Sequence, residues 1–263
     1  MEIGKERRLR RIFRVDKKTI IVPMDHGVTV GPIDGIVNMQ CIVDKLIIGG
    51  ADAIVINRGI AKCIDTGNVG LIVHLSGITL LCPDPNNKVQ ICSVEDAIRL
   101  GADAVSVHVN VGAKEEPQML KTLGEIACEC DNFGMPLLAM MYPRGPKIKD
   151  AHAVDVVAHA ARLGAELGAD IIKTNYTGDP KSFETVIESC PVPVIIAGGP
   201  KAETSRDVLQ MVKDSVTAGG AGLSIGRNVF QHNDPKRMVK ALATIVHDDA
   251  TVSDALKILG ESE

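Results

Sequence analysis

Ala169-Asp-Ile-Ile-Lys-Thr-Asn-Tyr176 is a short apolar run with one lysine set into it. A parallel strand buried on both faces reads as a near-continuous run of Val, Ile and Leu, and Lys173 breaks that pattern where the strand meets a polar loop. An ammonium group in an apolar interior loses its hydration and gives up its proton more easily. A partly neutral lysine can attack a carbonyl to form a Schiff base, although a strand-end lysine can also snorkel to solvent. The stretch alone favours the snorkelling lysine, and the rest of the chain favours the nucleophile.

The layout of this stretch recurs along the chain, at residues 50–57, 101–108, 168–175 and 219–226. In each copy a helical segment ends, glycine supplies a left-handed cap, and a short apolar strand follows. Each copy therefore leads from a helix into a parallel strand, and such crossovers are right-handed.

Eight apolar runs have the length of strands, and helical patterns separate most of them. This alternation favours a closed (β/α)8 TIM barrel over an open doubly wound sheet, and 263 residues is close to the ~250 typical of that fold. The link after the second strand is short and carries the weakest helical pattern. The predicted strands are 19–24, 53–57, 71–75, 104–109, 137–142, 171–174, 194–197 and 223–226. The predicted helices are 36–48, 94–100, 116–132, 154–167, 180–188, 202–217 and 236–246, with a short extra C-terminal helix at 252–259.

Composition and charge indicate one soluble domain over residues 1–263. Hydrophobic residues make up 45% and charged residues 24% of the chain, and no Pro/Gly/Ser linker interrupts it. The net charge of −4 gives no electrostatic basis for binding nucleic acid. No apolar run approaches the ~20 residues that span a membrane. The longest irregular stretch, residues 77–88, is predicted to be an insertion near the active face.

The cysteines and the N-terminal stretch bear on the compartment. Seven cysteines, an odd number with no Cys-x-x-Cys pair, indicate a reducing cytoplasm rather than a disulfide framework. The basic stretch Met1 to Arg14 lacks the apolar segment of a signal peptide. We expect it to form an amphipathic helix, with Ile12 and Phe13 on one side, that closes the barrel floor.

Every predicted strand ends on polar residues or glycine. In a TIM barrel the chemistry sits at the C-terminal ends of the strands, and a barrel built for stability alone would not need polar groups at every end. The strand-end residues are Asp25, His26, Asn57, Arg58, His74, His108, Asn110, Tyr142, Arg144, Lys173, Tyr176, Gly198, Gly199, Gly226 and Arg227.

Three of these residues, at two strand ends, suggest acid–base chemistry or anion binding. Asp25 can serve as a general base or orient a hydroxyl, or it can simply form a turn. Tyr142 and Arg144 lie two residues apart and share a face if the strand continues. A phenol there can pass a proton to a substrate oxygen, and a guanidinium can hold a phosphate or carboxylate; a rim tyrosine with a solvated arginine is the alternative.

The last two strands end in glycine, followed closely by a cation. Gly198 and Gly199 precede Lys201, and Gly226 precedes Arg227. Exposed backbone N–H groups at such turns can cradle a phosphate, and barrel enzymes often bind phosphate at these two loops. Tight turns without a ligand are the alternative interpretation.

Three histidines, His26, His74 and His108, lie at separate strand ends. None has the tight spacing of a metal-ligand motif. We therefore expect them to hydrogen-bond within the pocket, and we expect no metal and no cofactor; a metal-dependent lyase or isomerase remains the alternative of another class.

Taken together, seven motifs resemble the archaeal class I aldolase family, from about residue 19 to the end of the chain. They are Pro23-Met-Asp-His-Gly27, His74-Leu-Ser-Gly77, His108-Val-Asn-Val-Gly112, Met140-Met-Tyr-Pro-Arg-Gly145, the stretch from 161 to 178 that contains Lys173, Ala197-Gly-Gly-Pro-Lys201 and Gly226-Arg-Asn-Val-Phe-Gln-His232.

The resemblance implies roles for matching positions. Lys173 would form the Schiff base, Tyr142 would donate a proton and Asp25 would accept one. The implied substrate-binding residues are Asp25, His26, Gly27, Val28, Thr29, Tyr142, Pro143, Arg144, Lys173, Gly198, Gly199, Gly226 and Arg227.

The resemblance also implies the reaction. One branch of the family passes a three-carbon ketone unit from 1-deoxy-D-threo-hexo-2,5-diulose 6-phosphate to L-aspartate 4-semialdehyde, on an alternative route to 3-dehydroquinate and aromatic amino acids. The segment 108–112 is more similar to that branch than to its sister, the class I fructose-bisphosphate aldolases, which remain the alternative. A large ring-like homo-oligomer, such as a decamer, is implied as well.

Overall fold

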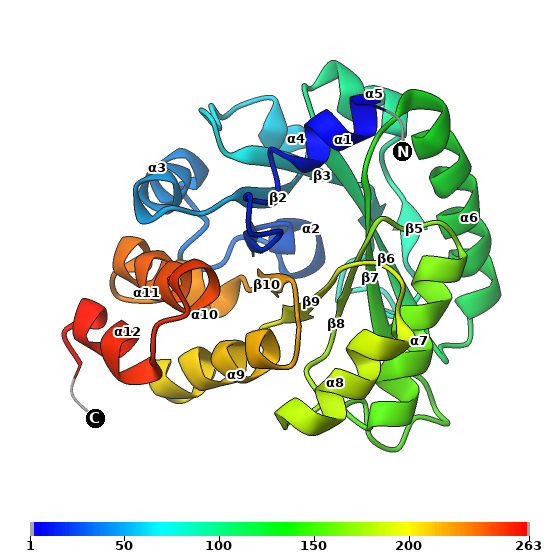
Figure 1. The fold of residues 1–263 in the computed structure, drawn as a ribbon. Helices are drawn as coiled ribbons and strands as arrows, with labels where there is room; N and C mark the ends of the chain where they lie inside the picture. The colour runs from blue at the N-terminus through cyan, green and yellow to red at the C-terminus, as the bar shows by residue number, and fades with distance from the viewer. Residues whose placement is uncertain (1–2, 262–263) are drawn as a thin grey trace.

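A closed barrel of eight parallel strands, surrounded by helices, is the framework of residues 3–261, the part of the chain that the computed structural model describes (Figure 1). Its hydrogen-bonded strand order is β1-β10-β9-β8-β7-β6-β3-β2, so the predicted TIM barrel is confirmed. The barrel strands are β1 (Thr19–Pro23), β2 (Ala53–Asn57), β3 (Gly70–His74), β6 (Ala104–Val111), β7 (Leu137–Pro143), β8 (Ile171–Thr174), β9 (Val194–Ala197) and β10 (Gly222–Ser224).

Helices of very different length follow the strands. The longer ones match the predicted segments to within about a turn, because their apolar faces repeat with the helical period. The helices are α1 (Ile3–Leu9), α2 (His26–Val30), α3 (Met39–Gly49), α4 (Arg58–Ala61), α5 (Val94–Arg99), α6 (Glu116–Phe133), α7 (Val154–Glu166), α8 (Pro180–Ser189), α9 (Ser205–Thr217), α10 (Arg227–Phe230), α11 (Pro235–Asp248) and α12 (Val252–Leu259).

Side-chain caps correct two predicted helix starts. Helix α3 begins at Met39 rather than at residue 36, because Asn38 accepts a hydrogen bond from the Cys41 backbone N–H at 3.1 Å. Helix α9 begins at Ser205 rather than at residue 202, because Thr204 and Asp207 form a reciprocal capping box.

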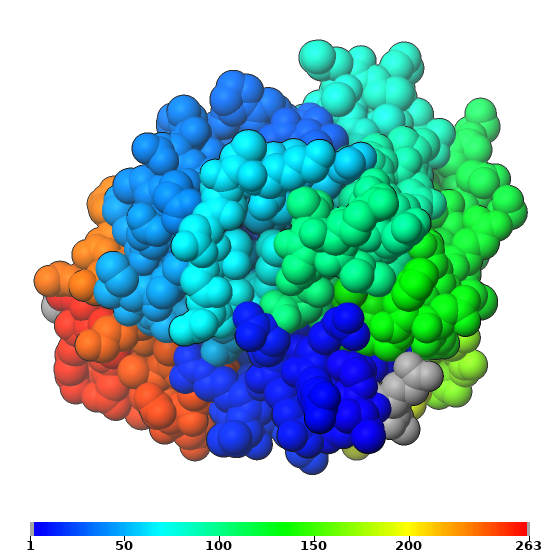
Figure 2. All heavy atoms as spheres, turned by 90° about the horizontal axis from the view of Figure 1, so that it is seen from above, coloured from blue at the N-terminus to red at the C-terminus, as the bar shows by residue number. Residues whose placement is uncertain are grey.

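The N-terminal stretch closes the barrel floor, as predicted, but not as one helix. Helix α1 ends at Leu9, and the chain then turns so that Ile12, fully buried, packs inside the barrel against Ile21, Ile72 and other interior side chains. The blue N-terminal segment lies against the green segment of the chain in Figure 2. Met1 lies outside the described residues.

Aspartates of the repeated Gly-Ala-Asp junction hold the floor together. Each accepts a hydrogen bond from a backbone N–H of the neighbouring strand: Asp52 from Ile20 at 2.8 Å, Asp103 from Leu71 at 2.9 Å and Asp170 from Leu137 at 2.9 Å. Each also pairs with a cation of the N-terminal segment, namely Arg14, Arg11 and Lys5 respectively. The repeat therefore fastens the strands at their N-terminal ends, which leaves the opposite ends free for a site. Within residues 3–261, no helix is long and apolar enough to cross a membrane.

Candidate active site

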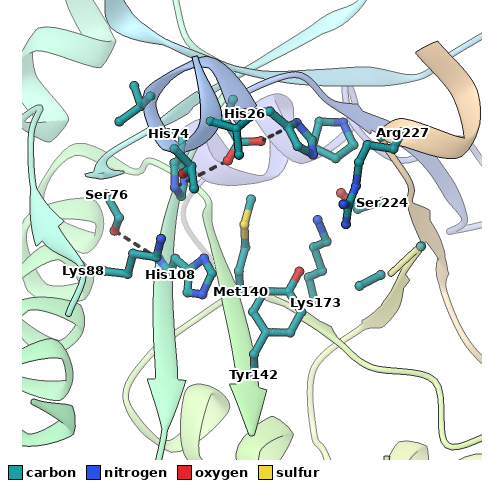
Figure 3. Close-up of a pocket in the computed structure, with 18 of the residues that line it drawn as sticks. His26, His74, Ser76, Lys88, His108, Met140, Tyr142, Lys173, Ser224 and Arg227 are labelled. Carbon is teal, nitrogen blue, oxygen red and sulfur yellow. Dashed lines mark hydrogen bonds and ion pairs between the residues drawn. The ribbon is translucent and has the colours of Figure 1, made fainter. Parts of the chain in front are cut away.

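A cavity of about 380 Å³ opens at the C-terminal ends of the barrel strands (Figure 3). Its wall combines the strand ends with the loop between two short antiparallel strands, β4 (Ser76–Gly77) and β5 (Val89–Gln90). Leu80 and Lys88 of that loop line the cavity, so the irregular stretch 77–88 does lie at the active face. Predicted residues from distant parts of the chain share this wall: Asp25, His26, Val28, Thr29, His74, His108, Tyr142, Arg144, Lys173, Gly198, Gly199, Gly226 and Arg227.

Lys173 enters the cavity because of its place in β8. Ile171 belongs to the apolar cluster inside the barrel and Ile172 to the cluster under the helices, so alternation turns Lys173 inward again. Its side chain is only 6% exposed, and within residues 3–261 no hydrogen bond or ion pair engages its amine. Figure 3 shows the Lys173 chain beside the Tyr142 ring, inside the cavity. A buried amine that no hydrogen bond or ion pair holds is available to react with a carbonyl.

Asp25 lies between two imidazoles. Its carboxylate oxygens are 3.7 Å from His74 Nε2 and 3.9 Å from His26 Nδ1, and Asn57 Nδ2 donates to its backbone carbonyl at 2.9 Å. Burial by itself would raise the pKa of Asp25, but His74, His26 and Lys173 outweigh it and lower that pKa. Asp25 is therefore an ionised carboxylate near neutral pH, suited to accept a proton.

Both imidazoles beside Asp25 are neutral near neutral pH. Burial lowers the pKa of His74 and of His26, more than the adjacent carboxylate raises either one. His74 Nδ1 lies 2.8 Å from the Ser106 hydroxyl, which fixes the ring. His26 packs edge-on against Phe230 with the ring centroids 5.2 Å apart. Both rings lie within 4 Å of the carboxylate, and the charge that each carries when protonated favours the ionised form of Asp25.

Tyr142 is held from two sides at the end of β7. The His108 ring centroid lies 5.0 Å from the Tyr142 ring, and the Arg144 guanidinium lies over that ring at 4.9 Å. His108 Nε2 donates to Asn110 Oδ1 at 2.8 Å. Burial, then the charges of Lys88 and Arg144, hold the pKa of His108 well below its usual value. A neutral His108 therefore packs beside the phenol without competing for its proton.

The glycine turns after β9 and β10 form the wall on the other side of Lys173. Asn228 ties the first turn down by donating to the Gly198 carbonyl at 3.0 Å. Arg227 donates to the Gly199 carbonyl at 2.9 Å. A Cβ on Gly226 would lie 2.7 Å from the Pro23 carbonyl oxygen, so only glycine fits there. The buried Ser224 hydroxyl lines this part of the cavity and has no hydrogen-bond partner among the described residues. This combination suits an anionic ligand group.

Several strand-end residues of the sequence do not face the cavity. Arg58 pairs with Asp96 at 3.3 Å, and Lys201 reaches the Gln231 carbonyl at 3.3 Å. Tyr176 packs behind the site against Phe183. Asn57 and Asn110 act behind the wall, as described above. Gly27 and Pro143 are not among the lining residues.

Other residues that line the cavity were not predicted from the sequence. The strand-end rule considers only the residues where a barrel strand stops, and it passes over loops and positions one turn further in. The lining residues that were not predicted as site residues are Pro23, Val30, Ser76, Gly77, Leu80, Lys88, Met140, Asn175, Ala197 and Ser224.

Metal ligation finds no support in the arrangement of the histidines. Among residues 3–261, no group of three or more His, Cys, Asp and Glu side chains could hold a metal ion. His26 and His74 flank Asp25, whereas His108 faces Asn110.

Comparisons with known proteins agree with this geometry. The family described as DeoC/LacD family aldolase matches residues 19–232. A 2-amino-3,7-dideoxy-D-threo-hept-6-ulosonate synthase of Halobacterium salinarum is 45% identical over 261 residues, covering 98% of this chain and 97% of that protein. A 2-amino-4,5-dihydroxy-6-oxo-7-(phosphonooxy)heptanoate synthase of Streptomyces griseus is 41% identical over 93% of this chain and 90% of that protein.

A solved structure is similar in both sequence and fold. It is an archaeal fructose-1,6-bisphosphate aldolase whose catalytic lysine is covalently bound to the carbinolamine intermediate of its substrate. The two chains share 37% identity with a TM-score of 0.87, over 92% of this chain and 99% of that one. The likeness therefore spans nearly the whole chain rather than one motif.

Proposed function

The chain belongs to the DeoC/LacD family of aldolases, and from that premise we propose that it is a 2-amino-3,7-dideoxy-D-threo-hept-6-ulosonate synthase. Its donor is 1-deoxy-D-threo-hexo-2,5-diulose 6-phosphate, its acceptor is L-aspartate 4-semialdehyde, and 2,3-dioxopropyl phosphate is released. The 45% identity with the Halobacterium salinarum synthase over nearly the full length supports this choice. One domain over residues 1–263 carries the activity, in a homo-oligomer in the cytoplasm, and the product enters the route to 3-dehydroquinate and aromatic amino acids.

Lys173 begins the reaction as the nucleophile. Its neutral amine attacks the methyl ketone of the donor, and the carbinolamine loses water to give an iminium. Tyr142, beside the Lys173 chain in the cavity (Figure 3), supplies the proton with which the oxygen leaves as water. The iminium withdraws electrons from the neighbouring carbon, so a carbon–carbon bond can break without a free carbanion.

Asp25 accepts the proton in the cleavage step. It takes the proton of the hydroxyl two carbons from the iminium carbon, and that oxygen becomes the aldehyde of 2,3-dioxopropyl phosphate. The electrons of the broken bond move into the iminium, leaving an enamine on Lys173. The lowered pKa of Asp25 keeps the carboxylate ready for this role.

Transfer reverses the same steps on a second aldehyde. The enamine carbon adds to the aldehyde carbon of L-aspartate 4-semialdehyde, and the proton held by Asp25 passes through Tyr142 to the new alkoxide; Tyr142 regains its own proton when the iminium is hydrolysed. Water then hydrolyses the iminium, which frees the product and Lys173. No metal and no nucleotide takes part.

Substrate binding uses the rest of the wall. Gly198, Gly199, Gly226 and Arg227 cradle the donor phosphate, and Asp25, His26, Val28, Thr29 and Arg144 complete the pocket. A phosphate held away from the reacting carbons helps to place them in register.

The observation that carries the proposal is the buried, unpartnered Lys173 in one cavity with Asp25 and Tyr142. Borohydride added with the diulose phosphate should reduce the iminium and leave a stable adduct on the Lys173 peptide, found by mass spectrometry. Lys147, which is exposed and outside the cavity, provides the control variant Lys147→Met, which should be trapped like the parent. An unmodified Lys173 peptide in the parent would end the proposal.

A class I fructose-bisphosphate aldolase is the second candidate. The solved archaeal aldolase at 37% identity favours it, and it would use the same lysine. The same trapping experiment with fructose 1,6-bisphosphate, paired with the rate of aspartate semialdehyde consumption, separates the two. Efficient cleavage of the bisphosphate with no incorporation of the semialdehyde would replace the synthase assignment.

A further inference from the structure

Two cations share the wall of the cavity that is formed by β6, β7 and the β4–β5 loop. Lys88 lies at the end of that loop, and Arg144 follows β7; both line the cavity. Burial first, and then the charge of Arg144, lower the pKa of Lys88, so the two positive groups act on each other. Within residues 3–261, no hydrogen bond or ion pair joins either side chain to an acidic group. Asp25 acts on Lys88 from across the cavity and favours its charge without forming an ion pair with it, so the two like charges form a site for a further anion.

The loop backbone that carries Lys88 and the guanidinium of Arg144 are both held in place by contacts within the protein. Asn110 Nδ2 donates to the Asn86 carbonyl at 2.7 Å, two residues before Lys88. The same amide accepts from His108, so it fastens the Lys88 loop to β6. Arg144 rests on the Tyr142 ring, with 4.9 Å from the guanidinium carbon to the ring centroid. Binding an anion here therefore costs little reordering.

This pair is separate from the glycine turns proposed for the phosphate. In the barrel order, β10 and β6 lie on opposite sides of the ring. Arg227, after β10, is on one side, and Lys88 is drawn beside His108 of β6 on the other, with Lys173 between them in Figure 3. One pocket therefore offers anion sites on two sides of the reacting amine.

We propose that Lys88 and Arg144 bind the carboxylate of the acceptor, an α-amino acid that carries an aldehyde. This inference rests on the proposed function and adds the residues that select the acceptor. A guanidinium and an ammonium together can hold both oxygens of a carboxylate, and they favour an anionic aldehyde over a neutral one.

Removing the charge of Lys88 tests the assignment. Lys88→Gln should raise the KM for L-aspartate 4-semialdehyde on the order of ten- to a hundredfold, the usual worth of a hydrogen bond to a charged group. The KM for propanal, an acceptor without a carboxylate, should not change. The concentration of the diulose phosphate that gives half-maximal borohydride trapping, measured without an acceptor, should also match that of the parent. Lys88→Arg should restore most of the affinity for the semialdehyde, and Lys147→Gln is the matched control.

Each result has one meaning. A semialdehyde KM in Lys88→Gln equal to that of the parent overturns the inference. Weaker trapping of Lys88→Gln by the donor alone also overturns it, because Lys88 would then hold the donor phosphate. A rise in the KM for propanal equal to that for the semialdehyde overturns it as well, because the substitution would then disturb the site in general. If borohydride does not trap the donor on Lys173 of the parent, the proposed function itself fails. If the parent is trapped but Lys88→Gln behaves like the parent, only the inference about the acceptor fails.

Discussion

Two buried lysines in this barrel have opposite surroundings. Lys5, at the floor, is 9% exposed, and its amine lies 2.7 Å from Asp131 and 3.1 Å from Asp170. Lys173, at the mouth, is 6% exposed and has neither a hydrogen bond nor an ion pair within residues 3–261. Burial works against the charge of Lys5, yet the two carboxylates outweigh it and raise the pKa of that lysine. A paired buried lysine holds a fold together, whereas an unpaired one is free to react.

The same contrast holds for the two ends of the barrel. At the floor, Arg11 pairs with Asp103 at 2.6 Å, and His247 lies between Asp16 and Asp52. At the mouth, neither Lys88 nor Arg144 forms an ion pair with a carboxylate among the described residues, and only the more distant charge of Asp25 acts on Lys88. Charges paired within the protein contribute to stability, and unpaired charges cost stability that a ligand can return. The comparison predicts that floor variants lose stability with activity intact, and that mouth variants lose activity with stability intact.

Replacing the mouth lysine should have the largest effect. Lys173→Met keeps an apolar chain of similar length and removes the nucleophile, so kcat should fall by at least about four orders of magnitude. The melting temperature should not fall, because a buried amine without a partner has been removed. Single-turnover kinetics and thermal unfolding measure both. A clearly destabilised variant would mean that Lys173 has a structural role, and the comparison would fail.

The floor lysine should respond in the opposite way. Lys5→Met leaves Asp170 without its cation, which should cost on the order of 1–2 kcal/mol in the free energy of unfolding, or a few degrees in melting temperature. The kcat and KM should stay at the parent values, since Lys5 lies at the far end of the barrel. Exposed Lys121→Met, on α6, is the matched control and should change neither quantity. If Lys5→Met is fully folded under the assay conditions and still loses activity, the contrast between the floor lysine and the mouth lysine is wrong.

The contrast also separates what the sequence could predict from what it could not. The barrel strands were predictable because apolar runs and glycine junctions are local signals. Lys173, Tyr142 and Asp25 were predictable as neighbours because strand ends of a parallel barrel converge at one face. Helices α2 and α10, and the β4–β5 pair, were missed, and α4 had only the weakest helical pattern, since segments of two to five residues are too short to show a period.

Pairing between distant residues was the harder part. The glycine of the Gly-Ala-Asp repeat was assigned its capping role, but Asp170 and its counterparts were not linked to the N-terminal cations, because each partner is far away in sequence. Arg58 and Lys201 followed strand ends and were candidates, yet each is turned to a partner outside the cavity. Lys88 lies in a loop where no strand rule applies, so only the folded chain brings it to Arg144.

The smallest expected effect is a pH-dependent part of floor stability. His247 Nδ1 lies 2.8 Å from Asp16 and its Nε2 3.0 Å from Asp52, so the ring is charged and bonded on both sides. Burial alone would lower its pKa, but the hydrogen bonds to Asp52 and Asp16 outweigh burial and raise that pKa above the ordinary 6.5. Because the pKa of His247 is higher in the folded than in the unfolded state, the protonated ring stabilises the folded state fully below about pH 6.5. This stabilisation is lost as the pH rises through the raised pKa.

The free energy of unfolding should show this window when the parent is compared with His247→Gln. The difference between them, on the order of 1 kcal/mol, should be largest near pH 6 and should shrink as the pH rises through the raised pKa. Exposed His159→Gln, on α7, should differ from the parent by the same small amount at every pH. Urea unfolding at a series of pH values measures both differences. A His247 difference that grows with pH would show that the neutral ring, rather than the charged one, stabilises the floor, and pairing of charges would no longer distinguish that end of the barrel from the mouth.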